Sequence, residues 1–386
     1  MNGEQKKTND KNLITTTLLS LYVVFAACYA PISMFVNMDG TLLSLLAFGA
    51  CALSIAMLSF AAGSFKSVFV YAISVIALVF LGATALPLGL FTSFAAGACI
   101  YAYLLLNHRS PFLYGVPVIA PIIVTVLTGE LSGIILSLLW LPASLLLAYV
   151  VKRRLARVSA ICHVSAGICL AIVALLGMFV FSIYGSITMT TLRAFVDETK
   201  SQSIVMMNTL IDEMAGAVGG LPVDITGYVD VAVQTVFNLI PAIIIIIGNV
   251  GAYVMHSMLL SICFTDEKTK KDALPMLAFE MSLVSAIVFL ISIILAFALT
   301  SADTAFYGAV AENVMIILCP GLVLTTLGAL RILTSRKGPS CLGTLLYFGV
   351  IFMLCSFSLP VIIICSIIGA ILIILANISR SRPKQD

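Results

Sequence analysis

The sequence predicts an all-α, polytopic helical membrane protein with about twelve transmembrane helices, each of roughly 20 apolar residues. The first observation is composition, because 61% of the 386 residues are hydrophobic and only 10% are charged. The second is where the charges lie, since between residues 13 and 151 only Asp39, Lys66, Arg109 and Glu130 carry one. Helices are expected because a backbone that crosses hydrocarbon must satisfy its N–H and C=O groups within its own segment.

Polar residues and Pro or Gly punctuation separate the apolar runs. The first run follows a polar start and lacks a small-residue cleavage pattern, so we expect it to stay as a first helix and not to be removed as a signal peptide. The predicted spans in chain order are 13–36, 41–61, 67–85, 88–106, 111–128, 131–151, 160–184, 236–264, 273–299, 306–330, 342–358 and 359–378.

The distribution of Lys and Arg predicts that both termini are cytoplasmic. With this orientation, all of the 20 basic residues except Arg193 and Lys200 fall on the cytoplasmic side, as the positive-inside rule requires. The predicted parts are a cytoplasmic tail (1–12), a six-helix membrane bundle (13–151), a basic cytoplasmic loop (152–159), a seventh transmembrane helix (160–184), an extracytoplasmic acidic helical hairpin (185–235), a C-terminal membrane bundle (236–378) and a basic cytoplasmic tail (379–386).

The hairpin is the one sizeable polar region. Apolar residues recur in it at steps of three and four, which predicts a helix with one apolar face, and the sequence 219–222 then breaks this helix before a second one that Asp224 caps. The apolar residues are Met189, Leu192, Val196, Met207, Leu210 and Met214. Two interpretations stay open, a lid that packs on its own protein or on lipid headgroups, and a docking or gating element. Its negative charge argues against nucleic acid as a partner.

Motifs of enzymes and metal sites are missing from the sequence. It has no H-E-x-x-H, no G-x-S-x-G and no P-loop, and its ten cysteines include no C-x-x-C pair. His163 and His256 stand without a second ligand at helical spacing. We therefore expect no enzymatic activity, no cofactor and no bound metal.

A few polar residues fall inside apolar runs, where they are costly and often functional. Glu280 is either an intramembrane acid or a residue close enough to the surface to reach it. Asn313, beside Glu312, either bonds across helices or contacts a solute, and Asn249, flanked by Gly248 and Gly251, suits close helix packing or a binding pocket.

The second half of the chain resembles the YybS-like family of uncharacterised bacterial membrane proteins. The residues that carry this resemblance are Leu274-Pro275, the run from Ala311 to Met315, Gly321-Leu322, Pro360, Gly369 and the basic end Arg380-Ser381-Arg382. The chain departs from the family at Ala370-Ile371, where an acid follows the glycine in the family. The resemblance implies a multi-pass protein of the bacterial cytoplasmic membrane.

In that family the N-terminal helices are similar to substrate-binding subunits of energy-coupling-factor vitamin transporters. Those subunits dock on a coupling membrane subunit through Ala-x-x-x-Ala in the first helix, a spacing that Ala26 and Ala30 supply. The resemblance also implies that solute enters from outside, near Asn37, Asp39 and Glu130, and that ATPases power the transport.

Two functional hypotheses follow. The first is solute binding or transport by a protein embedded in the lipid bilayer, with Asn37, Asp39, Glu130, Asn249 and Asn313 as candidate binding residues. The second is a membrane scaffold or regulatory protein that binds an extracytoplasmic protein through the hairpin.

Overall fold

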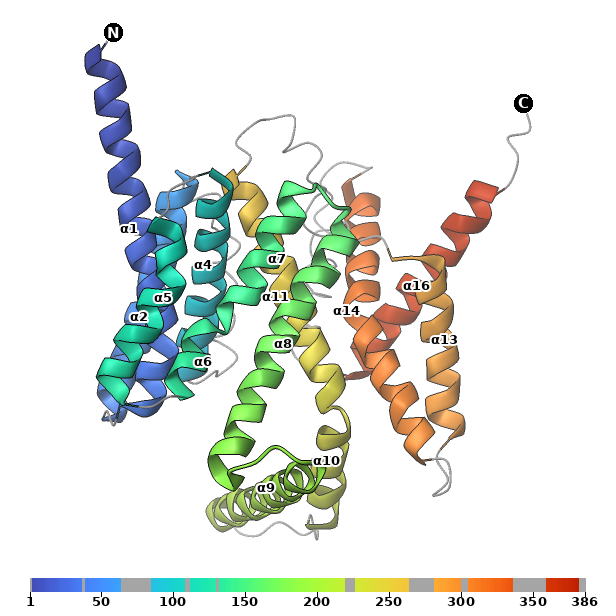
Figure 1. The fold of residues 1–386 in the computed structure, drawn as a ribbon. Coiled ribbons are helices and arrows are strands. Elements are labelled where there is room, and N and C mark those ends of the chain that lie inside the picture. Colours follow the sequence, from blue (N-terminus) through green and yellow to red (C-terminus); the bar gives the residue numbers. More distant parts are fainter. Residues whose placement is uncertain are drawn as a thin grey trace, which may run out of the picture. The chain divides into compact units, whose positions relative to one another are not determined.

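The computed structural model describes residues 2–36, 39–63, 85–107, 112–129, 132–218, 226–263, 281–299, 305–335 and 359–381. Within these ranges the regular elements are all helices, as the sequence predicts (Figure 1). They are α1 (Asn2–Phe35), α2 (Gly40–Ala62), α4 (Ala85–Asn107), α5 (Phe112–Thr128), α6 (Ser132–Leu138), α7 (Trp140–Lys152), α8 (Arg157–Tyr184), α9 (Met189–Val218), α10 (Thr226–Asn238), α11 (Ile240–Cys263), α13 (Leu283–Ala298), α14 (Ala305–Ser335) and α16 (Leu359–Ser381).

Among the described residues, 8 segments are long and apolar enough to cross a membrane, and α5 and α13 contribute shorter apolar helices. The predicted helical class is therefore confirmed, with helices that are long and apolar enough to span a membrane. The predicted span 342–358 and all of the span 67–85 except Ala85, which begins α4, lie outside the described residues. The number twelve therefore stays a prediction, as does the orientation of the chain.

Two predicted spans are interrupted in the structure. The span 131–151 is divided between α6 and α7 at Leu139, and the span 236–264 between α10 and α11 at Leu239. Each break lies just before a proline, Pro142 or Pro241. Proline has no N–H to donate to the carbonyl four residues earlier, and its ring clashes with that carbonyl, so a helix bends or ends there.

The ends of two other elements differ from the predictions. α1 begins at Asn2, so the predicted tail 1–12 continues the first helix, because Glu, Gln and Lys favour helix once a helix is nucleated next to them. α13 begins at Leu283 instead of residue 273, because Ser282 caps it by accepting a hydrogen bond from the Ser285 N–H at 3.1 Å.

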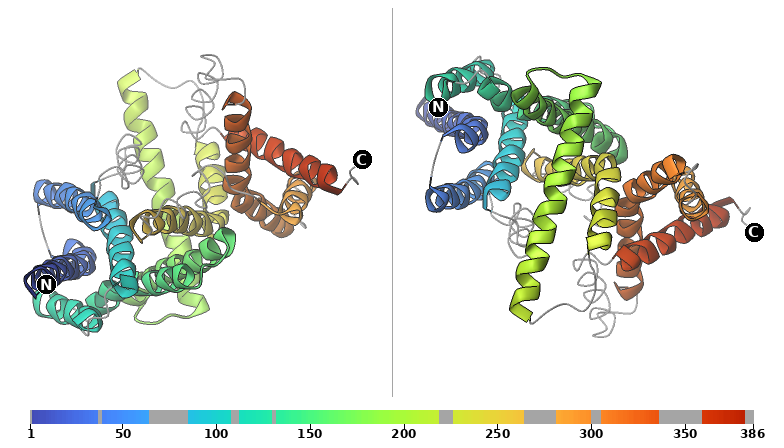
Figure 2. Two further views of the ribbon diagram at one scale, coloured as in Figure 1. Left: turned by 90° about the horizontal axis from the view of Figure 1, so that it is seen from above. Right: turned by 90° about the horizontal axis from the view of Figure 1, so that it is seen from below.

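The chain forms two compact units, which we describe separately. The first comprises residues 1–191 and 247–272, and the second comprises residues 192–246 and 273–386. In the first unit α4 packs against α1, α2 and α7 (Figure 2). Helix α1 also contacts α5 and α6, and α8 packs against α7. The inner helix α4 carries small buried residues, among them Ala95, Ala98 and Ala102, which let its neighbours approach closely.

In the second unit α13, α14 and α16 pack against one another in pairs. Their shared core holds Phe289, Met315 and Leu322. Gly369 of α16 lies directly against the carbonyl of Leu322 in α14, with no room for a Cβ atom between them. This close approach explains why a glycine stands in an otherwise bulky apolar helix.

The two helices of the polar insertion cross instead of running side by side (Figures 1 and 2). The point of contact is between Lys200 of α9, whose ammonium donates a hydrogen bond, and the side-chain oxygen of Gln234 in α10. Gly185, with φ of 66°, ends α8 by donating its N–H to the Phe181 carbonyl at 2.8 Å. The amphipathic helix that the sequence predicts after the seventh span is thus present as α9, and the extracytoplasmic hairpin stays a prediction.

Candidate functional site: an apolar cavity in the first unit

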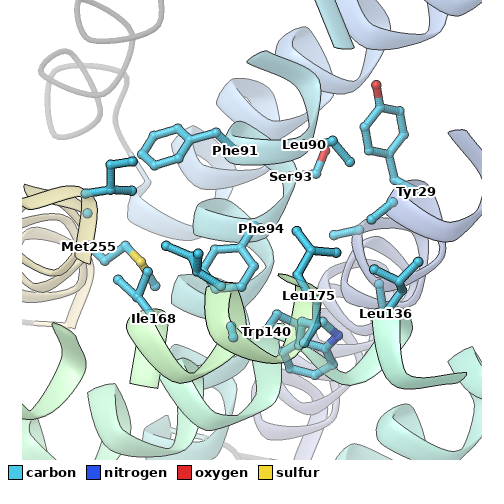
Figure 3. Close-up of a pocket in the computed structure, with 18 residues that line it drawn as sticks. Tyr29, Leu90, Phe91, Ser93, Phe94, Leu136, Trp140, Ile168, Leu175 and Met255 are labelled. Carbon is cyan, nitrogen blue, oxygen red and sulfur yellow. The ribbon is translucent and has the colours of Figure 1, made fainter. Parts of the chain in front are cut away.

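The first unit contains a half-open cavity of about 370 Å³. Small-molecule sites in proteins have volumes of about 300–1,000 Å³, whereas well-packed interiors contain few voids larger than a water molecule. The cavity is lined by Ala26, Ala27, Tyr29, Ala30, Leu90, Phe91, Ser93, Phe94, Leu136, Leu139, Trp140, Ile168, Ala171, Ile172, Leu175, Ile247, Gly251 and Met255 (Figure 3).

Small residues on three helices create this space. Ala26 and Ala30 are one turn apart on α1, Ala171 lies on α8, and Gly251 lies on α11. Larger side chains such as Phe94 of α4 close the remaining sides. The cavity therefore forms because these residues have small side chains and the helices that carry them do not move closer to fill the space.

Trp140 is held in one orientation at the cavity wall. Its indole N–H donates a hydrogen bond of 2.7 Å to the Ser137 carbonyl, and its ring packs edge to face against Tyr101, with 4.9 Å between ring centroids. The break between α6 and α7 places Trp140 at the first position of α7. The indole thus contributes an apolar surface to the cavity, while its N–H is already used.

Two of the lining residues, Tyr29 and Ser93, carry hydroxyl groups, but the oxygen atoms of both have almost no accessible surface and do not open to the cavity. Both side chains are buried, and neither hydroxyl has a hydrogen-bond partner among the described residues. Among the described residues that line the cavity there is no carboxylate, imidazole, ammonium or guanidinium group. This part of the lining therefore offers mainly apolar contacts.

The predicted docking residues Ala26 and Ala30 line this cavity. Ala26 is only 8% exposed, and a Cβ atom added at Gly97 of α4 would lie 2.9 Å from its methyl group. This contact within the first unit leaves little surface of Ala26 for a separate coupling subunit.

Of the three residues predicted to receive solute from outside, Asp39 is described by the structure and does not line the cavity. Asn37 and Glu130 lie outside the described residues. Asp39 is exposed and precedes α2 as its N-cap residue, without a side-chain capping bond. Their proposed role in solute entry stays a prediction.

Asn249 and Asn313 lie in different units. Asn249 is half-buried and is not part of the cavity lining, whereas its neighbour Gly248 packs against Ser165 and Cys169 of α8. The amide of Asn313 bonds to backbone groups of Asn238, Ala242 and Ala309. Both arrangements favour the helix-packing alternative that the sequence left open for these residues.

Metal-binding groups do not gather in the described part of the chain, since no three His, Cys, Asp or Glu side chains there could hold one ion. Cys28, Cys51, Cys99, Cys319 and Cys365 are buried and are not part of a disulfide bond. His163 is exposed and bonds to the Ser159 carbonyl through Nδ1 at 2.7 Å. Glu280 lies outside the described residues.

Sequence reasoning missed Tyr29, Ser93, Trp140 and Gly251 as members of one site. A signal was present, because Tyr29 and Ser93 place hydroxyl groups within apolar runs and Trp140 is the one tryptophan of the chain. These residues come from α1, α4, α7 and α11, and nothing in their spacing indicates that the four helices meet.

Comparison with known proteins gives one match. No curated protein and no solved structure matches the chain. A family model described as a predicted membrane protein, DUF2232, matches residues 72–371, a range that includes most of α4 to α16 and the greater part of the sequence. The chain therefore belongs to the DUF2232 family of predicted membrane proteins.

Proposed function

We propose that this DUF2232 protein is a solute-binding or transport protein of the membrane whose binding site is the cavity in the first unit. The observation that carries the proposal is the cavity of about 370 Å³ itself, lined by residues of α1, α4, α6, α7, α8 and α11 together with Leu139. Its volume falls in the range of small-molecule sites, and its apolar lining offers dispersion contacts to a bound molecule.

The resemblance to YybS-like proteins, and through them to substrate-binding subunits of energy-coupling-factor transporters, is consistent with this proposal. With the N-terminus cytoplasmic, Ala26, Tyr29 and Ala30 lie toward the outer end of the first span, where a solute from outside would arrive. Transport would then require a coupling membrane subunit and ATPases, and the protein itself would not be an enzyme. A bacterial cytoplasmic membrane is the proposed location.

The test is to fill the cavity and to compare the small molecules that co-purify with the protein. Ala171→Phe places a ring in the cavity from α8, whereas Ala166→Phe makes the same change at an exposed position of the same helix. Both proteins are purified in mild detergent and extracted for mass spectrometry. We expect a metabolite that is enriched with the native protein and with Ala166→Phe and is absent from Ala171→Phe. Identical extracts from all three proteins would contradict the proposal.

The entry route is tested separately at the outer loops. Asp39→Asn and Glu130→Gln remove charge without changing side-chain size. If these residues receive the solute, its association rate falls in both variants while the folded protein keeps its thermal stability. Unchanged association would remove both residues from the route and leave the cavity as the site.

The second candidate function is a scaffold whose crossed helices bind an extracytoplasmic protein. A specific observation favours it, because the predicted apolar face of α9 is exposed in the structure: Met189 is 71%, Val196 41% and Leu210 44% exposed. Acidic residues such as Asp197 and Glu213 flank this face, so an apolar surface with basic groups around it is the partner chemistry that fits.

A photoreactive residue at Leu210 tests the scaffold function in native membranes, with the exposed neighbour Thr209 as the control position. We expect one extracytoplasmic protein to be cross-linked at Leu210 in near-stoichiometric yield, and this product to be lost when Val196→Glu is added. Cross-linking of lipid alone would mean that the apolar face of α9 rests on the bilayer and would contradict the scaffold function.

A further inference from the structure

Four basic side chains gather where α7 is joined to α8 (Figure 1). They are Lys152, Arg153 and Arg154, which are exposed, and Arg157, which is half-buried. The described helices that supply or contact these residues, α7, α8 and α11, contain neither Asp nor Glu in their sequences. These helices therefore bring positive charge to the connection between α7 and α8 and no carboxylate to neutralise it.

The connection lies between two segments that are long and apolar enough to cross a membrane, Gly133–Lys152 and Arg157–Tyr184. Where two neighbouring spans leave the hydrocarbon together, the residues that join them lie at the depth of the lipid headgroups. Tyr149, one turn before the connection, is of a type that is enriched at this depth. The anions that are always present there are lipid phosphates, so charge complementarity favours a lipid as the partner of this surface.

Arg157 is held in position by Tyr253 of α11. The Nη2 group of Arg157 donates a hydrogen bond to the Tyr253 hydroxyl oxygen at 3.2 Å, and the guanidinium carbon lies 5.0 Å from the centre of the Tyr253 ring, within the range of a cation–π interaction. A guanidinium has five N–H groups in a planar fork, so it can bond to a tyrosine and to a phosphate at the same time. Arg157 is thus oriented before an anion arrives, which reduces the entropic cost of binding.

Arg154 occupies a position where the backbone favours glycine. Its φ is 51°. The Leu155 N–H donates to the Val150 carbonyl and the Arg154 N–H to the Val151 carbonyl, both at 3.1 Å, which is the pattern of a Schellman motif with its left-handed residue at Arg154. A side chain in this conformation is sterically costly, and glycine avoids the cost. An arginine at this position indicates a role for its charge other than folding.

We propose that the connection between α7 and α8 binds the phosphate of an anionic phospholipid, with Arg157 as the central contact and Lys152, Arg153 and Arg154 around it. A zwitterionic lipid also carries a phosphate, but the four cations repel its ammonium group. The site therefore selects a headgroup with net negative charge. Neither Arg157 nor Tyr253 lines the cavity, so this proposal is independent of the solute-binding function.

Two phospholipids with the same acyl chains test the proposal, phosphatidylglycerol and phosphatidylcholine. The full chain is purified in mild detergent, each lipid is titrated in, and native mass spectrometry counts the lipids bound per chain. We expect the first phosphatidylglycerol to bind at least roughly tenfold more tightly than phosphatidylcholine, the ratio that one charge-assisted hydrogen bond supplies. Inorganic phosphate at the same concentration should not displace it, because it lacks acyl chains that bury apolar surface against the helices.

Substitutions that keep the net charge distinguish a specific site from a general attraction by positive charge. Arg157→Lys keeps the charge but loses the planar fork, and Tyr253→Phe removes the hydroxyl that holds the guanidinium. Each should lower phosphatidylglycerol affinity several-fold. The matched controls are Lys152→Arg, which also exchanges one cation for another, and Tyr149→Phe, which keeps the ring that Arg153 lies over at 6.0 Å. Both controls should bind phosphatidylglycerol as the native protein does.

Four outcomes would overturn the proposal. Equal binding of the two lipids by the native chain needs no variant and would show that no anionic lipid is selected. Native affinity for phosphatidylglycerol in both Arg157→Lys and Tyr253→Phe, with thermal unfolding showing that they are folded, would leave only a general attraction by charge. Displacement of the lipid by inorganic phosphate would assign the cations to a soluble anion. An acidic protein that co-purifies in place of the lipid would assign them to a protein partner.

Discussion

The side-chain amide of Asn313 bonds to two backbone groups, the Ala242 N–H and the Asn238 carbonyl, that would pair with each other in a continuous helix. In a continuous helix the Ala242 N–H would donate to the Asn238 carbonyl. Instead the Ala242 N–H donates to Asn313 Oδ1 at 3.0 Å, and Asn313 Nδ2 donates to the Asn238 carbonyl at 2.8 Å. A primary amide offers both a donor and an acceptor, so Asn313 satisfies both groups where α10 ends and α11 begins.

We predict that Asn313→Leu lowers the free energy of unfolding by about 1–3 kcal/mol, since it leaves a backbone N–H and a carbonyl unpaired. Asn313→Asp should also destabilise, because a carboxylate cannot donate to Asn238. A thiol-reactive dye during heating is a suitable measurement, since Cys319 and Cys365 of the same unit are buried. Asn377→Leu, which removes an amide bonded to the Ile373 carbonyl of its own helix, is the control. Equal stability of the native protein and Asn313→Leu would show that the Asn313 amide does not stabilise the junction of α10 and α11.

The contact of α14 with α16 depends on Gly369. We predict that Gly369→Ala destabilises the second unit by about 1–3 kcal/mol, because the new methyl group meets the Leu322 carbonyl and the Thr326 hydroxyl. Gly49→Ala is the matched control on α2, where a Cβ atom meets nothing within 4 Å. The same dye measurement should show earlier labelling for the first variant alone. If Gly369→Ala instead raised stability, α14 and α16 would have moved apart to accept the methyl group. The prediction that their close contact is needed would then be wrong.

Tyr22 and Tyr29 should respond differently to the same substitution. Tyr22→Phe removes the hydrogen bond to Ser54, and an interhelical bond of this kind contributes about 0.6–2 kcal/mol in membrane proteins. Tyr29→Phe removes a hydroxyl without a partner among the described residues, so stability should stay the same or rise. Thermal midpoints of both variants in the absence of added solute check this. A larger loss for Tyr29→Phe would mean that a co-purified molecule or a lipid already pairs with its hydroxyl.

The predicted orientation can be tested with single cysteines in a Cys162→Ala background, which removes the thiol that is exposed among the described cysteines. Thr190→Cys on α9 and Lys152→Cys at the end of α7 are both at exposed positions. A membrane-impermeant maleimide applied to intact cells should label the first variant and not the second, since the positive-inside rule puts residue 152 in the cytoplasm. Labelling of Lys152→Cys in intact cells would invert the topology.

The limits of the sequence are visible in the interrupted spans. α2, α8 and α16 lie within a few residues of their predictions, because a run of apolar residues bounded by polar ones determines where a helix can stay in hydrocarbon. Pro142 and Pro241 indicated that these two spans would not be regular helices throughout. A proline is, however, compatible with a kink, a break or the first turn of a helix. Which of these occurs depends on neighbours, as the 71-residue separation between Ala242 and Asn313 illustrates.

The sequence by itself determined that this is a helical membrane protein with an amphipathic helix after its seventh predicted span, because hydropathy and periodicity are local properties. The resemblance to energy-coupling-factor subunits also pointed to Ala26 and Ala30 through their four-residue spacing. Only the tertiary structure decided that these residues, Tyr29 of the same helix, Ser93 of α4 and Gly251 of α11 face one cavity. A small side chain allows either close helix contact or an empty space, and the positions of all surrounding helices determine which one forms.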